Sequence, residues 1–314
     1  MRILFAGTPE IAVPTLRALS EHFEVGAVLT TVDKPGSRGK TPIPSAVKEE
    51  ALRLNLPVVQ VEHLKGEARS LIASYGCDTL VCFAYGKLFG PKFLSLFSGE
   101  KLNIHPSLLP LLRGSSPIQG AILNQFSQTG ISVQRIEQEM DSGDLLSSVT
   151  LALQGDETTE SLTALVKERA ALLAVESLHS LENGTASFTP QQGTPTYTQM
   201  ITKDMAKIDW TLPAKAIHAL VRTLYPWPKA STLYEGQVLM ITSVYGNVQE
   251  AGLEPVPEQV GCGTVVRKEK GKGIAIATGS GLLWVNRLQL EKRKDLDWQS
   301  FLNGNRSFLE TRLE

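Results

Sequence analysis

RILFAGTPEIAVPTLRALSEHFEVGAVLT, residues 2–30, contains two apolar runs that flank a helical pattern. The first run, residues 2–7, ends in glycine and has the unbroken apolar character of a strand that is buried on both faces. Apolar residues then recur on one side of a helix over residues 9–19, and a second strand follows at residues 23–30. A crossover of this length between two strands predicts that they run parallel.

The same alternation of strand and helix patterns continues to about residue 188. It predicts strands at residues 57–61, 79–85, 101–105, 130–136 and 145–153, and helices at residues 46–54, 66–75, 116–123 and 159–181. Alternation of this kind is typical of a Rossmann-like, doubly wound α/β fold with a mostly parallel sheet. We therefore expect a first domain over residues 1–188.

The pattern changes after this point. Residues 189–206 are rich in Thr, Gln and Pro, have weak periodicity, and are expected to form a linker. Within residues 207–314, one helix is predicted at 214–224 and a last helical piece at 297–304. The short, regularly spaced strand-like runs between them, separated by turn residues, predict a small β-barrel.

The formal net charge of −1 excludes a generally basic nucleic-acid coat protein. The charge is unevenly distributed, because residues 207–314 contain 14 Lys and Arg against 11 Asp and Glu, a net of +3. That excess would suit an anionic partner for the C-terminal part, and chance scatter of surface charge is the alternative.

The cysteine content and the N-terminal segment both indicate the cellular setting. The three cysteines stand at no metal-ligand or disulfide-framework spacing, which fits a reducing environment. The N-terminal segment has no signal-peptide core, and no stretch approaches the ~20 apolar residues of a membrane span. We expect a cytoplasmic protein without a membrane segment, and the scattered histidines predict no metal site.

The stretch KLNIHPSLLP, residues 101–110, is the first candidate for a functional site. Side chains alternate between the faces of a strand, so Asn103 and His105 are expected to point the same way. Pro106 marks the carboxyl end of that strand, where ligands bind in open α/β sheets. The alternative is a polar strand end with a structural histidine.

The stretch MDSGD, residues 140–144, also follows a predicted strand. Its carboxylates, Asp141 and Asp144, could orient the imidazole, stabilise its charge or hold a water. An ordinary Asp-Ser-Gly-Asp turn is the alternative, and the residues alone favour it.

Other patterns add little or exclude functions. FAGTPE lacks the glycines of a dinucleotide-binding site, which argues against a nicotinamide dehydrogenase. The chain has no Walker A sequence and no nucleophile elbow. DKPGSRGK, residues 33–40, is a basic, glycine-rich loop that could contact phosphate or could simply be solvated.

NIHPSLLP (103–110), RGSSPIQGAI (113–122) and MDSGD together resemble the formyltransferase family that uses 10-formyltetrahydrofolate. The resemblance implies that Asn103, His105 and Asp141 are catalytic. It also implies that the segment after His105 lies against the folate, with contacts from Ser107, Leu108, Leu109 and Pro110.

FAGTPE (5–10), SRGK (37–40), IDW (208–210) and YPWP (225–228) are similar to family members whose acceptor is methionyl-initiator tRNA. This resemblance implies a C-terminal barrel of OB type that presents a basic surface to the tRNA. It also implies that the loop at residues 33–40 approaches the acceptor end, through Arg38 and Lys40. The partners implied are the tRNA and the folate co-substrate, with no metal and a monomeric chain.

The implied reaction agrees with the motifs. A neutral amine attacks a formyl carbon without help from an enzyme nucleophile, so the missing Ser or Cys elbow is expected. An amide at Asn103 can stabilise an oxyanion, and His105 can do so too or can relay a proton. The rival interpretations are a sister formyltransferase for glycinamide ribonucleotide or a nucleotide sugar, and an RNA-binding module with an inactive α/β domain.

Overall fold

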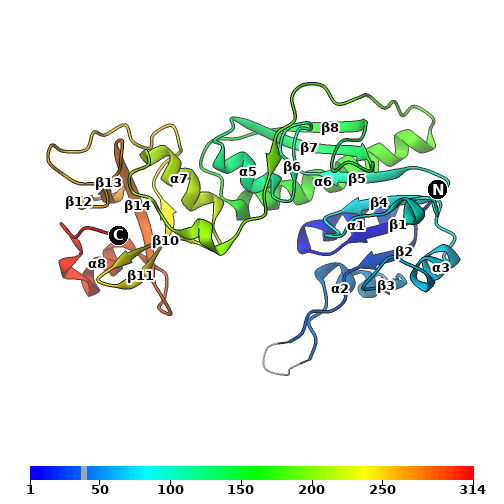
Figure 1. Ribbon diagram of the computed structural model, residues 1–314, viewed down its shortest axis with the longest axis horizontal. Helices are drawn as coiled ribbons and strands as arrows, with labels where there is room; N and C mark the ends of the chain where they lie inside the picture. The colour runs from blue at the N-terminus through cyan, green and yellow to red at the C-terminus, as the bar shows by residue number, and fades with distance from the viewer. Residues whose placement is uncertain (37–40) are drawn as a thin grey trace. The chain divides into compact units, whose positions relative to one another are not determined.

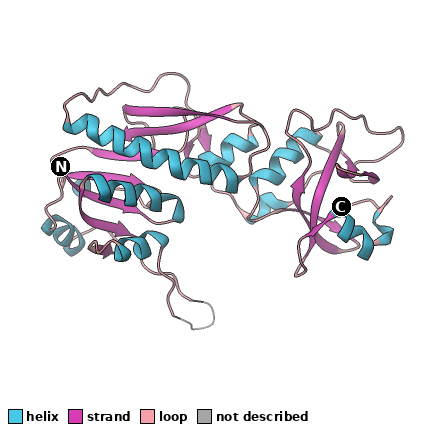
Figure 2. Cartoon of the chain, turned by 180° about the vertical axis from the view of Figure 1, so that it is seen from behind, coloured by secondary structure: helices cyan, strands magenta, loops and turns pink. Residues whose placement is uncertain are grey.

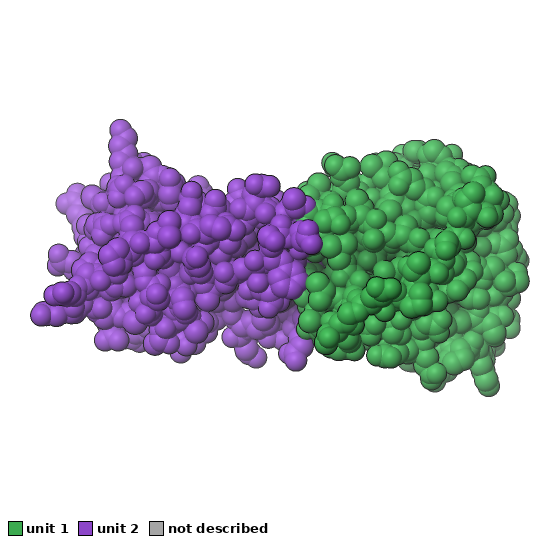
Figure 3. Space-filling model, turned by 90° about the horizontal axis from the view of Figure 1, so that it is seen from above, with its two compact units in different colours: residues 1–117, 129–151, 163–198 green, residues 118–128, 152–162, 199–314 purple. Residues whose placement is uncertain are grey.

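The computed structural model describes residues 1–36 and 41–314, so Arg38 and Lys40 lie outside the described residues. The described chain divides into two compact units, which Figure 3 colours separately. Unit 1 comprises Met1–Pro117, Thr129–Leu151 and Thr163–Thr198; unit 2 comprises Ile118–Gln128, Ala152–Leu162 and Gln199–Glu314.

The sheet of unit 1 has the strand order β3-β2-β1-β4-β5-β7-β8 (Figure 1). Its strands are β1 (Arg2–Gly7), β2 (Glu24–Thr30), β3 (Val58–Gln60), β4 (Thr79–Phe83), β5 (Lys101–His105), β7 (Gln128–Arg135) and β8 (Leu145–Ala152). The first five of these strands pair in parallel, and β7 pairs antiparallel with β5. The predicted doubly wound, mostly parallel α/β sheet is confirmed.

The helices of this part of the chain cover both faces of the sheet. They are η1 (Glu10–Ala12), α1 (Val13–His22), α2 (Ala46–Arg53), α3 (Glu67–Ser74), α4 (Pro91–Leu94) and most of α6 (Thr159–Glu182), whereas α5 (Pro117–Leu123) falls almost wholly in unit 2. Leu4 and Ala6 of β1 face the buried cluster that includes Ile72 of α3 and Phe93 of α4. On the other face, the long helix α6 crosses the sheet in Figure 2, and its His179 contacts the ring of Phe23 beside α1.

Unit 2 is built on an antiparallel sheet with the strand order β10-β11-β14-β13-β12, and β15 pairs with β14. Its elements are η3 (Lys203–Ala206), α7 (Ala214–Thr223), β10 (Ala230–Tyr234), β11 (Gln237–Val244), β12 (Val265–Glu269), β13 (Gly273–Ala277), β14 (Leu282–Leu290), β15 (Leu296–Asp297), α8 (Trp298–Gly304) and η4 (Arg306–Phe308). Ile217 and Val221 of α7 and Phe301 of α8 join the strands in one buried apolar core. The predicted C-terminal β domain is confirmed.

The chain after η4 joins the two edge strands of this sheet. Leu233 of β10 exchanges backbone hydrogen bonds with Glu314, at 3.0 and 3.2 Å. Val265 of β12 donates to the Thr311 carbonyl at 2.9 Å and accepts from the Glu310 N–H at 2.8 Å. The segment therefore satisfies backbone groups at both edges and gives the sheet the closed character of a barrel.

The segment that follows α6 is less independent than its composition indicates. Thr189 exchanges backbone hydrogen bonds with Leu145 of β8. Further along, β9 (Tyr197–Thr198) pairs in parallel with β6 (Arg113–Gly114). Residues 189–198 are thus held to unit 1 by hydrogen bonds rather than by an apolar face, which explains their weak periodicity.

None of the helices that the structure describes is both long enough and apolar enough to cross a membrane.

Candidate functional site

Asn103 and His105 project from one face of β5, as the alternation of the strand predicts. In the antiparallel register, Asn103 lies opposite Gln134 of β7 and His105 lies opposite Ser132. Directly opposed residues of an antiparallel pair project from the same face of the sheet. A patch of four polar side chains therefore forms on two neighbouring strands.

Asp141 lies over this patch. Its Oδ1 accepts hydrogen bonds from Asn103 Nδ2 at 3.2 Å and from Gln134 Nε2 at 3.0 Å. Its Oδ2 accepts from the Gly114 N–H at 2.9 Å and lies 3.5 Å from His105 Nδ1. The structure thus brings together Asn103, His105 and Asp141.

The route by which Asp141 reaches the patch follows from the direction of β7. This strand is antiparallel to β5, so its carboxyl end, where the loop with Asp141 begins, lies beside the start of β5. The loop folds back over the sheet, and the Arg135 N–H donates to the Asp144 carbonyl at 2.9 Å. A Cβ at Gly143 would collide with the Arg135 carbonyl, so this close approach requires glycine.

The surroundings of His105 determine which of its nitrogens carries the hydrogen. Nε2 lies 2.9 Å from the Leu112 carbonyl oxygen, which can only accept, so Nε2 is assigned the N–H. Burial is the main cause that lowers the pKa of His105, and the charge of Arg113 adds to it, while Asp141 opposes the shift. The neutral ring can then take a proton at Nδ1, where the carboxylate stabilises the imidazolium.

The turn after His105 is pinned to β7. The Ser132 hydroxyl donates to the Ser107 carbonyl at 2.7 Å and accepts from the Leu109 N–H at 3.2 Å. Ser107, Leu109 and Pro110 are buried, while Leu108 is half-buried and packs on Gly130. Of the four residues expected to contact folate, Leu108 is the one whose side chain reaches towards the surface.

Two residues of the site were not found from the sequence. Gln191 Nε2 donates to the backbone carbonyls of Asp141 and Gly143, both at 2.8 Å. Its Oε1 accepts from the buried guanidinium of Arg113, at 2.7 Å from Nη2. Arg113 could have been identified, because it belongs to the motif RGSSPIQGAI. Gln191 belongs to the expected linker, where no pattern marks it as a residue of the site.

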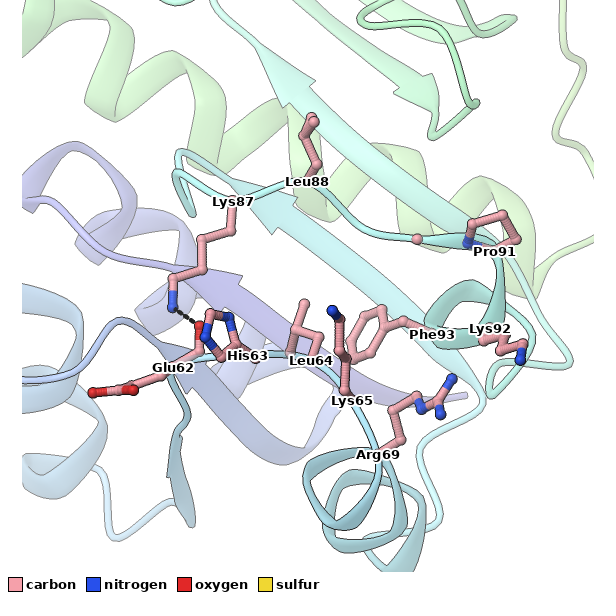
Figure 4. Close-up of a pocket in the computed structure, with 11 residues that line it drawn as sticks. Glu62, His63, Leu64, Lys65, Arg69, Lys87, Leu88, Pro91, Lys92 and Phe93 are labelled. Carbon is pink, nitrogen blue, oxygen red and sulfur yellow. Dashed lines mark hydrogen bonds between the residues drawn. The ribbon is translucent and has the colours of Figure 1, made fainter.

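A second feature of unit 1 is a cationic pocket of about 740 Å³. It is formed by the loops after β3 and β4 and by the starts of α3 and α4, and Lys65, Arg69, Lys87 and Lys92 line it (Figure 4). Lys87 Nζ donates to the carbonyls of Val61 and Glu62 and so ties the two loops together. In the part of the chain that the structure describes, these four cations form no ion pair with a carboxylate.

Because β3, β4 and β5 run parallel, the pocket opens at the sheet edge where the carboxyl ends of these strands lie. That is the edge at which open α/β sheets bind ligands. The pocket and the polar patch thus belong to the same side of unit 1. A ligand with an anionic end would find complementary charge there.

The thiol nearest the patch is unsuited to nucleophilic attack. Cys82 of β4 lies beside Asn103 in the sheet, and burial raises the pKa of its thiol to about 12. Within residues 1–36 and 41–314, no group of three His, Cys, Asp or Glu side chains is arranged to hold a metal ion. The arrangement offers hydrogen-bond donors and a proton acceptor.

Comparison with known proteins gives two matches to protein-family models. The model described as "Formyl transferase" matches residues 1–178, and the model described as "Formyl transferase, C-terminal domain" matches residues 200–306. Together they span most of the chain.

Individual relatives agree. The chain is 37% identical over 319 residues to a methionyl-tRNA formyltransferase of Treponema denticola, covering 99% of this chain and 98% of the relative. It is 36% identical over 311 residues to that of Heliobacterium modesticaldum, covering 98% of each. Among solved structures, an N-formyltransferase of Helicobacter canadensis in complex with folinic acid and dTDP-3-aminofucose has a similar fold. Its TM-score is 0.62 at 18% identity, over 90% of this chain and 97% of that one.

Proposed function

The chain belongs to the formyl transferase family, and from that membership we propose that it transfers a formyl group from 10-formyltetrahydrofolate to the α-amino group of methionyl-initiator tRNA. The observation that carries the proposal is the way Asp141 holds Asn103 and faces His105. Relatives named for this reaction align with nearly the whole chain, the C-terminal part included.

The site's geometry suits each part of this reaction. The amine forms a bond to the formyl carbon, and the carbonyl oxygen becomes an oxyanion. Asn103 gives one amide hydrogen to Asp141 and has a second with which to stabilise that oxyanion. The proton lost by the amine goes to Nδ1 of His105, and it passes to N10 of the folate as the C–N10 bond breaks.

The cationic pocket supports a folate donor. A folate ends in a glutamate whose carboxylates need cationic partners or water. Lys65, Arg69 and Lys92 line the pocket together with the exposed side chain of Leu88, so charge and an apolar surface are both available there (Figure 4). The formylated ring would lie near Leu108 and the Asn103 amide, with its glutamate towards this pocket.

The surface of unit 2 supports an RNA acceptor. The turn between β14 and β15 carries three consecutive exposed cations, Lys292, Arg293 and Lys294. Lys268 near the end of β12 and Lys270 in the turn that follows it are also exposed. Clustered lysines and arginines on a barrel are typical of surfaces that bind a nucleic-acid backbone.

The experiment supplies the purified protein with 10-formyltetrahydrofolate and methionyl-initiator tRNA and measures formyl-methionine after deacylation. We expect rapid product formation, and none with the uncharged tRNA. Glycinamide ribonucleotide and dTDP-3-aminofucose serve as competing acceptors. If either is formylated while methionyl-tRNA is not, the proposed acceptor is wrong.

We further infer that the protein works as a monomer in the cytoplasm. The hydrogen bonds that bring Asn103, His105 and Asp141 together are made within the chain. Sedimentation of the active protein checks this, since activity confined to a dimer would contradict it.

A further inference from the structure

We propose that Gln191 is a positioning residue for formyl transfer, whose neutral amide fixes the turn that carries Asp141 and, at its other end, the guanidinium of Arg113. The inference rests on the proposed function, because it assigns a task within that reaction. It concerns a residue that touches neither substrate directly and acts through Asp141 and Arg113.

The amide nitrogen of Gln191 fixes the turn. Nε2 lies 2.8 Å from the Asp141 carbonyl, 2.8 Å from the Gly143 carbonyl and 3.1 Å from Gln134 Oε1. Two of these acceptors flank the turn, and Gln134 itself donates to Asp141 Oδ1 at 3.0 Å. One side chain thus holds the turn directly and, through Gln134, the carboxylate that it presents.

The turn needs such support because of its backbone conformation. Asp141 has a φ of 53°, in the left-handed region that residues other than glycine seldom adopt. Residues in this conformation persist where their surroundings hold them, and they gather at functional sites. Donation to the carbonyls on either side of Ser142 is suited to keep Asp141 in place.

The amide oxygen of Gln191 fixes Arg113. Oε1 accepts from Nη2 at 2.7 Å and from Nε at 3.2 Å. Arg113 is 8% exposed, and the carboxylate near it, Glu139, is 3.5 Å away and largely in solvent. The close acceptor of this buried guanidinium is therefore uncharged, and the positive charge is kept in the site.

That retained charge acts on the proton acceptor. The charged groups around His105 are Asp141 from the loop after β7 and Arg113 from β6, and Glu139 reaches Arg113 from the surface. Arg113 favours the neutral imidazole, which is the form that can accept a proton. A glutamate at position 191 would reverse both effects: it would offset the charge of Arg113, and it would repel the two carbonyls.

A purely structural role is the alternative, and Thr198 provides the matched control. It belongs to the same segment, and its Oγ1 accepts from the Ser116 N–H and donates to the Arg113 carbonyl, both at 3.2 Å. It makes no hydrogen bond to the Asp141 turn or to the guanidinium of Arg113 among the residues described. Loss of these two hydrogen bonds loosens the segment and leaves the contacts of Gln191 in place.

The test compares Gln191→Ala, Gln191→Glu and Thr198→Val in the full-length chain. We expect Gln191→Ala to lower kcat between about 10- and 100-fold, as displacement of a catalytic group does, while KM for tRNA stays within about twofold. Gln191→Glu should also lower kcat, and it should move the acid limb of the pH–rate profile to higher pH, because the imidazolium is stabilised. Thr198→Val should keep kcat within about twofold even if it melts earlier.

Hydrogen exchange gives a readout that does not depend on activity. The Arg135 N–H donates to the Asp144 carbonyl. Its exchange rate should be about 10-fold higher in Gln191→Ala than in wild type, and it should be unchanged in Thr198→Val. The inference is overturned if Gln191→Ala is as active as wild type, if Thr198→Val loses as much kcat, or if Gln191→Glu leaves the pH profile unmoved. A wild-type protein without activity towards methionyl-tRNA would refute the proposed function instead, and the exchange rates would still decide the role of Gln191.

Discussion

Each unit of the protein buries a histidine within reach of an arginine, and the two histidines have opposite surroundings. His105 in unit 1 has a backbone carbonyl at one nitrogen and the carboxylate of Asp141 at the other. His218 in unit 2 accepts a hydrogen bond at Nδ1 from Arg222 Nε, at 3.0 Å. Its buried Nε2 has no hydrogen-bond partner among the described residues.

The consequence is a difference in what each imidazole can do. Burial, followed by the charge of Arg222, lowers the pKa of His218 to about 4, so this ring stays neutral near pH 7. At His105, burial and the charge of Arg113 also lower the pKa of the imidazole, but Asp141 raises it. The carboxylate of Asp141 lies beside Nδ1, where it can stabilise the protonated ring. A nearby carboxylate therefore separates a histidine that can exchange protons during a reaction from one that is locked in a core.

Replacement of each histidine by asparagine is the strongest test of this contrast. We expect His105→Asn to lower kcat by about 10²- to 10⁴-fold, because the proton acceptor is lost. His218→Asn should leave kcat within about twofold, since Asn still offers an acceptor to Arg222. Single-turnover formylation of methionyl-tRNA measures both, and similar losses in the two variants would remove the distinction.

The stability of unit 2 should depend on pH through His218. The folded-state pKa of about 4 lies below the ordinary 6.5, so the unfolded chain takes up the proton first as the pH falls. The contribution is complete above about pH 6.5 and is lost progressively down to about pH 4, on the order of 3 kcal/mol in total.

Tryptophan fluorescence can follow this loss in unit 2. All four tryptophans of the chain, Trp210, Trp227, Trp284 and Trp298, belong to unit 2. Denaturant titrations of wild type and His218→Asn at pH 7 and pH 4.5 give the difference. If both proteins lose the same stability, the buried imidazole is not the cause.

The turn of Asp141 should be sensitive to a single added methyl group. We expect Gly143→Ala to lower the free energy of unfolding by about 1–3 kcal/mol and kcat by roughly 10-fold, because the Cβ displaces the turn from β7. Gly304→Ala is the control, since a Cβ there would meet nothing within 4 Å. Chemical denaturation and steady-state kinetics measure the two effects, and equal behaviour of both variants would argue against a tightly packed turn.

The smallest effects are expected on the basic turns of unit 2. The double variant Arg293→Glu, Lys294→Glu should raise KM for tRNA by about 10-fold with little change in kcat, at a cost of roughly 1.4 kcal/mol. The dependence of KM on salt should weaken as well. Lys215→Glu on α7 also replaces a cation by an anion, but on another element. An equal rise in KM for this variant would mean that net charge, rather than a contact at the turn, causes the effect.

The sequence predicted those parts of the fold and the site that depend on local periodicity. Alternation along residues 101–105 was sufficient to orient Asn103 and His105 on one face, and apolar runs identified the strands that carry the sheet. A loop that folds back over an antiparallel strand has no periodic sequence pattern. The prediction that Asp141 is catalytic therefore depended on the family resemblance. Gln191 was missed because hydrogen bonds to backbone carbonyls leave no pattern in the chain that makes them.

The cationic pocket was missed for a related reason. Its cations come from two loops and two helix starts, and they are separated along the chain by up to 27 positions. No short stretch among them is markedly basic. The hydrogen bonds from Lys87 to the Val61 and Glu62 carbonyls bring these loops together, along with the apolar cluster that Leu64 and Phe89 pack against.

The interleaved course of the chain has a consequence for protein synthesis. All residues of unit 1 have been synthesised once residue 198 is made, and the Gln191 contacts can form when that segment has emerged from the ribosomal exit tunnel. Gly155 and Glu157 of unit 2 cannot complete their contacts at that stage. Their carbonyls accept hydrogen bonds from the Val248 N–H and from Arg222, which are synthesised later. A nascent chain therefore passes through an interval in which the proposed formyl-transfer site can assemble while the proposed tRNA-binding part is still incomplete.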